Sequence, residues 1–251
     1  MNYLNLNLNT MKLLMIIILF FPFIAFSQVD SLRWDFPVKP GSKEWLNIAD
    51  FEKRLVLLDI PESILRKIST QELVKSCLSY PGFSLIYTRN DLQAGYNYIR
   101  SMFNGFRELE NRPDAGKVLM KIYIDYKPDG FDLSLSDLQI GRYVFKFNYI
   151  EILLAQTVIQ NNMGNDDLSE LMTMCNQKYK VKKTMQKYYG GIGLKTTALI
   201  VARLQAKKLA NVKMKYGDQK VNEFINSLSL DNIDLMDDII IENEKILSDG
   251  L

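Results

Sequence analysis

Histidine is absent from this 251-residue sequence, and it contains only two cysteines. Without an imidazole, the chain can form neither a Ser-His-Asp nor a Cys-His catalytic unit, and it lacks the usual side chain that titrates near neutral pH. Every zinc site with a histidine ligand is excluded, and two thiols cannot supply a four-thiolate site. Catalysis would therefore have to use carboxylate, Lys, Tyr, Ser or Thr groups. We predict no metal site and no cofactor.

An excess of charge of one sign is also missing, because 31 basic and 29 acidic residues leave a formal net charge of +2. The hydrophobic fraction of 47% and the charged fraction of 24% are ordinary for a globular protein and argue against disorder. The length suffices for one or two domains with a sizeable core.

The first 27 residues contain no acidic side chain and a single basic one, Lys12. An apolar run follows over residues 13–26, and Ala25 and Ser27 place small residues shortly before Gln28. This pattern is typical of a secretory signal peptide cleaved near Ser27-Gln28. The alternative is a retained membrane anchor, but the run is shorter than the roughly 20 residues that a spanning helix needs. We expect a secreted or periplasmic bacterial protein with no transmembrane segment after cleavage.

The spacing of apolar residues is helical almost throughout the remaining chain. Ser42, Pro61 and the capping box Ser69-Thr70-Gln71-Glu72 mark helix starts, and Tyr80-Pro81-Gly82 marks an end. Longer helices are predicted over residues 91–103, 115–126, 136–163, 166–183, 194–209, 218–228 and 232–247. We predict an all-α fold, an irregular helical hairpin bundle of about ten short-to-medium antiparallel helices. It forms a single helical domain over residues 28–251, with residues 36–127 and 136–251 as candidate sub-lobes.

Three carboxylates are weak candidates for catalysis. Glu151 lies within an apolar run on the most hydrophobic predicted helix, where a carboxylate must be paired or neutralised. We expect it to pair with an arginine, or else to line a cleft. Asp234 and Asp238 lie one helical turn apart and can act as an acid/base pair, although they also fit a solvated helix face.

Charge is strongly segregated along the sequence. Residues 178–220 contain twelve basic side chains and one acid, whereas residues 221–251 contain eight acids and one lysine. One explanation is that the acidic last helix packs along the basic helices. The other is an anion-binding face for an anionic polymer, formed within residues 178–220. Its candidate residues are Lys180, Lys182, Lys183, Lys187 and Lys195.

The glycine-rich segment from Gly190 to Thr196 looks like a phosphate-binding loop at first sight. That motif requires glycine directly before lysine, and here Leu194 separates Gly193 from Lys195. We therefore predict no ATP binding. The cysteines, Cys77 and Cys175, each lie in a helical pattern and are expected to be buried. A disulfide between them is the alternative, because such bonds persist outside the cytoplasm.

Several short runs together resemble a family of secreted bacterial all-helical proteins. They are Pro40-Gly41 with Trp45, Ile60-Pro61-Glu62, Ser69 to Val74, Tyr80-Pro81, Phe103 to Leu109, Arg112 to Ala115, and Tyr149 to Gln156. The resemblance covers most of residues 36–160 and implies a helical, exported protein. The family has no established activity, so it implies no site residue.

These observations lead to three functional hypotheses. The first is a secreted helical binding or structural module of the bacterial cell envelope, whose partner is a protein, peptide or envelope polymer. The second is a carboxylate-dependent hydrolase or lyase that acts on extracellular glycan or peptidoglycan. The third is polyanion binding through residues 178–220.

Overall fold

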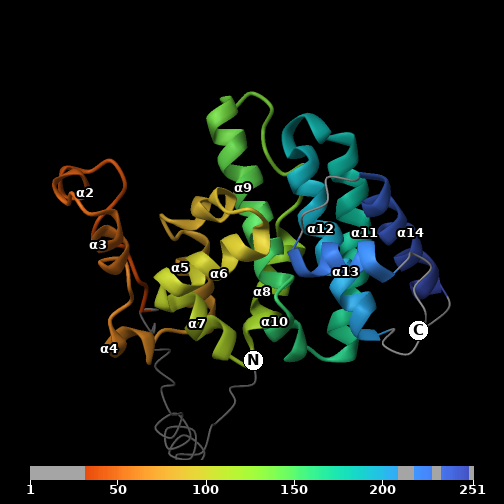
Figure 1. Cartoon of the computed structure of the whole chain (residues 1–251), viewed down its shortest axis with the longest axis horizontal. Coiled ribbons are helices and arrows are strands. Elements are labelled where there is room, and N and C mark those ends of the chain that lie inside the picture. The colour runs from red at the N-terminus through yellow and green to blue at the C-terminus, as the bar shows by residue number, and fades with distance from the viewer. Residues whose placement is uncertain (1–31, 209–217, 228–232, 249–251) are drawn as a thin grey trace, which may run out of the picture. The chain divides into compact units, whose positions relative to one another are not determined.

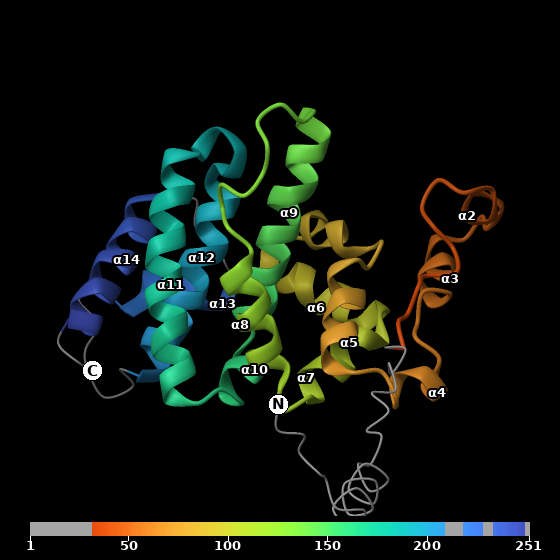
Figure 2. The ribbon, with the colours of Figure 1, turned by 180° about the vertical axis from the view of Figure 1, so that it is seen from behind.

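A computed structural model describes residues 32–208, 218–227 and 233–248 (Figures 1 and 2). Every regular element in these ranges is a helix and none is a strand, which confirms the predicted all-α fold. The first half contains α2 (Lys43–Asn47), α3 (Phe51–Val56), α4 (Glu62–Leu65), α5 (Thr70–Leu78), the 3₁₀ helix η1 (Phe83–Thr88), α6 (Leu92–Met102) and α7 (Asn104–Asn111). The second half contains α8 (Ala115–Asp125), α9 (Asp137–Leu154), α10 (Thr157–Asn161), α11 (Asn165–Thr184), α12 (Gln186–Lys208), α13 (Asp218–Ser227) and α14 (Ile233–Ser248).

Side-chain caps set the starts of several helices in the first half. The hydroxyl of Ser69 accepts a hydrogen bond from the backbone N–H of Glu72 at 3.2 Å, and the carboxylate of Asp91 accepts one from Ala94 at 2.7 Å. Each cap satisfies a backbone donor that has no partner within the helix. The capping box predicted at Ser69 is half formed, because the Glu72 carboxylate pairs with Lys75 at 2.6 Å.

The single helix predicted over residues 136–163 is wrong, because α9 ends at Leu154 and α10 starts at Thr157. Two side chains satisfy the carbonyl groups at this break. A guanidinium N–H of Arg203 donates to the carbonyl oxygen of Ala155 at 2.7 Å, and the Gln160 amide donates to that of Leu154 at 3.0 Å. The break is therefore stabilised by groups from α12 and α10, which apolar spacing within α9 cannot reveal.

The α12 helix starts at Gln186, eight residues earlier than predicted, and it is kinked at Gly190. This glycine has φ of 57° and ψ of −164°, a conformation that side chains with a Cβ disfavour. The kink allows residues 186–189 to turn away from the main axis of α12. Glycine is also needed at Gly193, where a Cβ would lie 2.7 Å from the Cβ of Tyr189.

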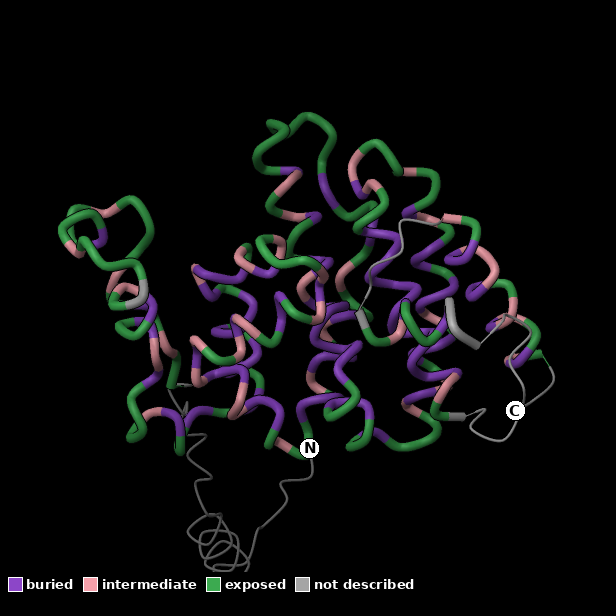
Figure 3. Tube along the Cα trace, viewed as in Figure 1, coloured by how far each residue is buried: buried purple, intermediate pink, exposed green. Residues whose placement is uncertain are grey.

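The helices of the second half form the most extensive contacts. The α11, α12 and α14 helices pack against one another, and α9 packs against both α8 and α12 (Figures 1 and 2). Buried residues run along the facing sides of these helices (Figure 3). All described residues belong to one compact unit that begins at Leu32. No described helix is long and apolar enough to cross a membrane, and the apolar run of residues 13–26 lies outside the described residues.

Candidate functional site

Glu151 lies near the end of α9, and none of its surface is exposed. Its neighbours in sequence, Ile150 and Ile152, are also buried. An ionised carboxylate in such surroundings is stable only when cations and hydrogen-bond donors surround it. Its partners therefore decide what this part of the molecule can do.

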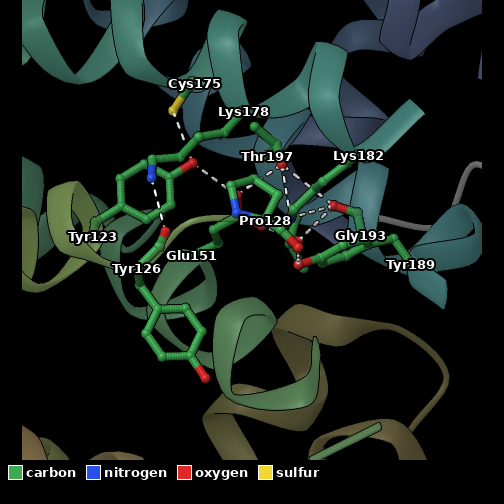
Figure 4. A network of polar contacts seen from close by, with 11 residues as sticks. Tyr123, Tyr126, Pro128, Glu151, Cys175, Lys178, Lys182, Tyr189, Gly193 and Thr197 are labelled. Carbon is green, nitrogen blue, oxygen red and sulfur yellow. Dashed lines mark hydrogen bonds and ion pairs between the residues drawn. The ribbon is translucent and has the colours of Figure 1, made fainter. Parts of the chain in front are cut away.

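Four side-chain donors surround the Glu151 carboxylate (Figure 4). Its Oε1 accepts from the hydroxyls of Tyr123 and Thr197, both at 2.8 Å. Its Oε2 accepts from the ammonium of Lys182 and the hydroxyl of Thr196, both at 2.5 Å. Each carboxylate oxygen thus has two donors from the chain itself.

The ammonium group of Lys182 is equally enclosed, with a fully buried side chain. It donates to Glu151, to the carbonyl oxygen of Gly193 at 2.8 Å and to the Thr197 hydroxyl at 3.0 Å. These three bonds use all three ammonium protons. The ammonium nitrogen also lies 4.4 Å from the ring centre of Phe147 and 5.0 Å from that of Tyr189. Burial lowers the pKa of Lys182, and the charge of Glu151 opposes that shift.

Residues from four helices meet in this network. Tyr123 comes from α8, Glu151 from α9, Lys182 from α11, and Thr196 and Thr197 from α12. We call these five residues the buried network. Each helix contributes at least one polar group, so the network fixes how the four helices align.

The network continues from Tyr123 to a thiol. The Tyr123 oxygen lies 3.9 Å from the sulfur of Cys175, and since the phenol proton goes to Glu151, the thiol is the donor in this contact. Burial raises the pKa of Tyr123 well above its usual value, with further contributions from Cys175 and Glu151. Burial likewise raises the pKa of Cys175. Both groups are thus neutral, and neither is a nucleophile at neutral pH.

The buried network offers no opening for a substrate. Every strong donor and acceptor described above has a partner within the chain, and neither Glu151 nor Lys182 lines either of two cavities on the surface of the described residues. The prediction that an arginine pairs with Glu151 is wrong, because the cation in this ion pair is Lys182. Sequence reasoning singled out Glu151 but missed Tyr123, Thr196 and Thr197. The pair of threonines after a glycine-rich kink was the available signal.

The other two candidate carboxylates lie one turn apart on α14, where Asp234 is exposed and Asp238 is half-buried. The nearby Asp237, which sequence reasoning did not select, contacts two side chains of α11. It accepts from the Tyr179 hydroxyl at 2.9 Å and from Lys183 at 2.7 Å. Asp237 therefore attaches α14 to α11.

The five candidate anion-binding lysines have different environments. Lys182 and Lys195 are buried, and each has partners within the chain. Lys180 and Lys183 form ion pairs with Glu244 and Asp237 of α14, at 2.5 and 2.7 Å. Lys187 is exposed, with its ammonium 5.4 Å from the ring centre of Tyr188. The arrangement matches an acidic helix packed along basic ones, and residues 209–217 of the basic segment lie outside the described residues.

Cys77 and Cys175 are both buried, free thiols, so the structure contains no disulfide between them. Among the residues described, no group of three or more cysteine, aspartate or glutamate side chains is placed to hold a metal ion. The segment from Gly190 to Thr196 also has a different role from a phosphate loop. Its Thr196 hydroxyl is directed at a carboxylate, and residues 193–197 are buried.

Comparisons of the chain with protein-family models, with curated proteins and with solved structures found no match. The resemblance to a family of secreted helical proteins therefore stays a prediction.

Proposed function

We propose that this chain is a helical binding module of the bacterial cell envelope that holds a protein, peptide or polymer without chemically converting it. The observation that carries the proposal is the complete enclosure of Glu151 by four donors of its own chain. The acid best placed for chemistry is thus committed to holding helices together. The signal-like first 27 residues support the cell envelope as the location.

The geometry argues against the hydrolase hypothesis. Glycoside hydrolysis by paired acids needs two carboxylates on either side of an open cleft, roughly 5–10 Å apart. The donors around Glu151 are hydroxyls and an ammonium, so no second acid faces it within the network. Asp234 and Asp238 lie on one helix and line neither surface cavity.

The contacts of residues 178–220 also argue against this basic segment as the surface that binds the partner. Polyanion binding there requires exposed lysines that lack acidic partners. Four of the five candidate lysines are buried or ion-paired with α14. The described lysines of this segment therefore fit a role in helix packing better than a role in binding a polyanion.

Turnover assays test the absence of catalysis directly. The full chain is incubated with purified peptidoglycan and with soluble acidic polysaccharides, and released reducing ends and muropeptides are measured over time. We expect no release above the level of buffer. Saturable release that disappears in Asp234→Asn or Asp238→Asn would overturn the proposal, and both substitutions lie on α14 away from the buried network. Glu151→Gln is a further variant, checked for folding by circular dichroism.

Export is tested separately. The full-length chain is produced in a Gram-negative host, and the periplasmic form is examined by N-terminal sequencing. We expect the mature chain to begin at Gln28. Retention of residues 1–27 on a membrane-bound form would contradict the predicted cleavage.

A further inference from the structure

Two cavities on the surface of the described residues share part of their lining. The first has a volume of about 490 Å³ and the second about 660 Å³, and Arg33 and Ser79 line both. The walls come from the extended segment of residues 33–40, the end of α5, the end of α8 and the first half of α9. We call this feature the basic groove.

The basic groove contains five cations and one carboxylate. Arg33, Lys75 and Lys146 line the first cavity, and Arg33, Lys39 and Arg142 line the second. Lys75 pairs with Glu72, beside the groove, and Lys39 pairs with Asp35 at 3.5 Å. Arg33, Arg142 and Lys146 form no ion pair with any residue that the structure describes.

These three unpaired cations attract an anionic ligand. Arginine presents a planar fork of donors that matches a carboxylate, and two of the three cations are arginines. The one described carboxylate that lines the groove, Asp35, is already paired with Lys39, so no acid among the described residues neutralises them. All three side chains are exposed, so they can reach a ligand without a change in the fold.

The walls between the cations are apolar. Leu78, Ile122 and Tyr126 line the first cavity, and the Tyr126 ring centre lies 5.8 Å from the Lys146 ammonium. Tyr126 is held in place by stacking on Tyr143, with ring centres 4.3 Å apart. A ligand that fills this cavity therefore gains by burying an apolar group next to its anionic groups.

Few side chains of the groove accept hydrogen bonds, as sugar hydroxyls require. Its only uncharged polar aliphatic side chain is Ser79, whose hydroxyl donates to the carbonyl oxygen of Lys75 at 2.8 Å. Asp35 is occupied by Lys39. The hydroxyls of a glycan gain little from such side chains, whereas the acidic and apolar side chains of a peptide match the cations and the apolar walls.

We infer that the basic groove binds a peptide segment in which carboxylate side chains alternate with apolar ones. The inference rests on the proposed function and names the ligand class and its site. Carboxylates lie against Arg33, Arg142 and Lys146, and an apolar side chain lies against Leu78, Ile122 and Tyr126.

Fluorescence anisotropy tests this inference with the full chain and a nine-residue peptide of repeated aspartate, leucine and glutamate that carries a neutral label. A second peptide replaces the acids by asparagine and glutamine, and a third replaces leucine by serine. We expect the first peptide to bind, and each of the other two to bind at least about tenfold more weakly. Weakening of the first complex by salt is expected, because its charges are exposed to solvent.

A pair of matched variants locates the site. Arg142→Glu with Lys146→Glu reverses two charges in the groove, and Lys67→Glu with Lys117→Glu makes the same charge change at exposed lysines outside it. We expect about a tenfold loss of peptide affinity in the first variant and less than a twofold change in the second. We expect both variants to fold, because all four side chains are exposed, and circular dichroism checks this.

Three results would overturn the inference. They are the absence of peptide binding, an equal loss of affinity in the two variants, and tighter binding of polygalacturonate than of the acidic peptide through Arg142 and Lys146. The first and third leave the proposed function intact with another ligand. Turnover of an envelope polymer, by contrast, removes the proposed function even where the peptide binds.

Discussion

The buried network and the basic groove use the same kinds of charged side chain in opposite ways. In the buried network, the Lys182 ammonium has its three donor positions filled by oxygen atoms of the chain. In the basic groove, Arg33, Arg142 and Lys146 have no acidic partner among the described residues. A satisfied charge inside the protein specifies helix packing, whereas an unsatisfied charge on the surface remains available to a ligand.

This comparison shows why the number of charges in a sequence segment predicts little. Lys182 and Lys183 are neighbours in a basic run, yet one is fully buried and the other lies in a partly exposed ion pair with Asp237. The groove draws its cations from residues 33, 39, 75, 142 and 146, none of which belongs to that basic run. Burial and partners determine what each charge does.

The largest effect is expected from Lys182→Met. Removing the ammonium leaves Glu151 buried without a cation, so the free energy of unfolding should fall by about 3–5 kcal/mol. Urea denaturation followed by circular dichroism measures this loss. Lys180→Met is the control, because its ion pair with Glu244 is exposed and should contribute about 0–1 kcal/mol. Similar losses in the two variants would remove the distinction between buried and exposed charges.

Tyr123→Phe should have the next largest effect. The phenol donates to an ionised carboxylate, and loss of such a bond costs about 1.5–3 kcal/mol of unfolding free energy. In the control Tyr143→Phe, the lost bond is to the neutral carbonyl of Lys127 at an exposed position, and about 0.5–1.5 kcal/mol is expected. The same denaturation experiment compares both. An equal cost would indicate that Glu151 does not strengthen its hydrogen bonds.

Alkaline pH should reduce the difference in unfolding free energy between the unsubstituted chain and Tyr123→Phe. Burial raises the pKa of Tyr123 well above its usual value of 10, so above pH 10 the folded state holds a proton that the unfolded state releases. The contribution of Tyr123 is fully present below pH 10 and is lost as the pH rises toward the folded-state pKa. The difference in unfolding free energy should shrink by up to about 1.4 kcal/mol per pH unit. Denaturation curves between pH 8 and 11 measure it, and a difference that shrinks already below pH 9 would contradict the assignment.

The smallest effect on stability is expected in the groove. Arg142→Met and Lys146→Met should each change the unfolding free energy by no more than about 0.5 kcal/mol, since both side chains are exposed and lack ion pairs with the described residues. Thermal or urea unfolding measures this directly. A loss well above 1 kcal/mol would show that these cations support the fold and would weaken the comparison.

Local sequence signals predicted much of the helical framework. The caps at Ser69 and Asp91 bind the backbone where helix starts were expected. The apolar run around Glu151 correctly indicated a buried acid. These features depend on residues within a few positions of one another, which is the range over which capping and helical periodicity act.

Long-range features could not be predicted in the same way. The cation that pairs with Glu151 comes from α11, 31 residues later in the sequence, and any of several lysines or arginines could have met it. The break between α9 and α10 depends on Arg203, 48 residues beyond Ala155. The basic groove joins residues from positions 33 to 146, so only the folded chain assembles it.

The buried network also has a consequence for the order in which the chain is made. Glu151 leaves the ribosome before its partners, because Lys182 follows 31 residues later, Thr196 follows 45 later and Thr197 follows 46 later. Until α12 is complete, closing the earlier helices would enclose a carboxylate with neither its cation nor two of its hydroxyl donors. We therefore expect these helices to close on one another only when α12, the last of them, is complete.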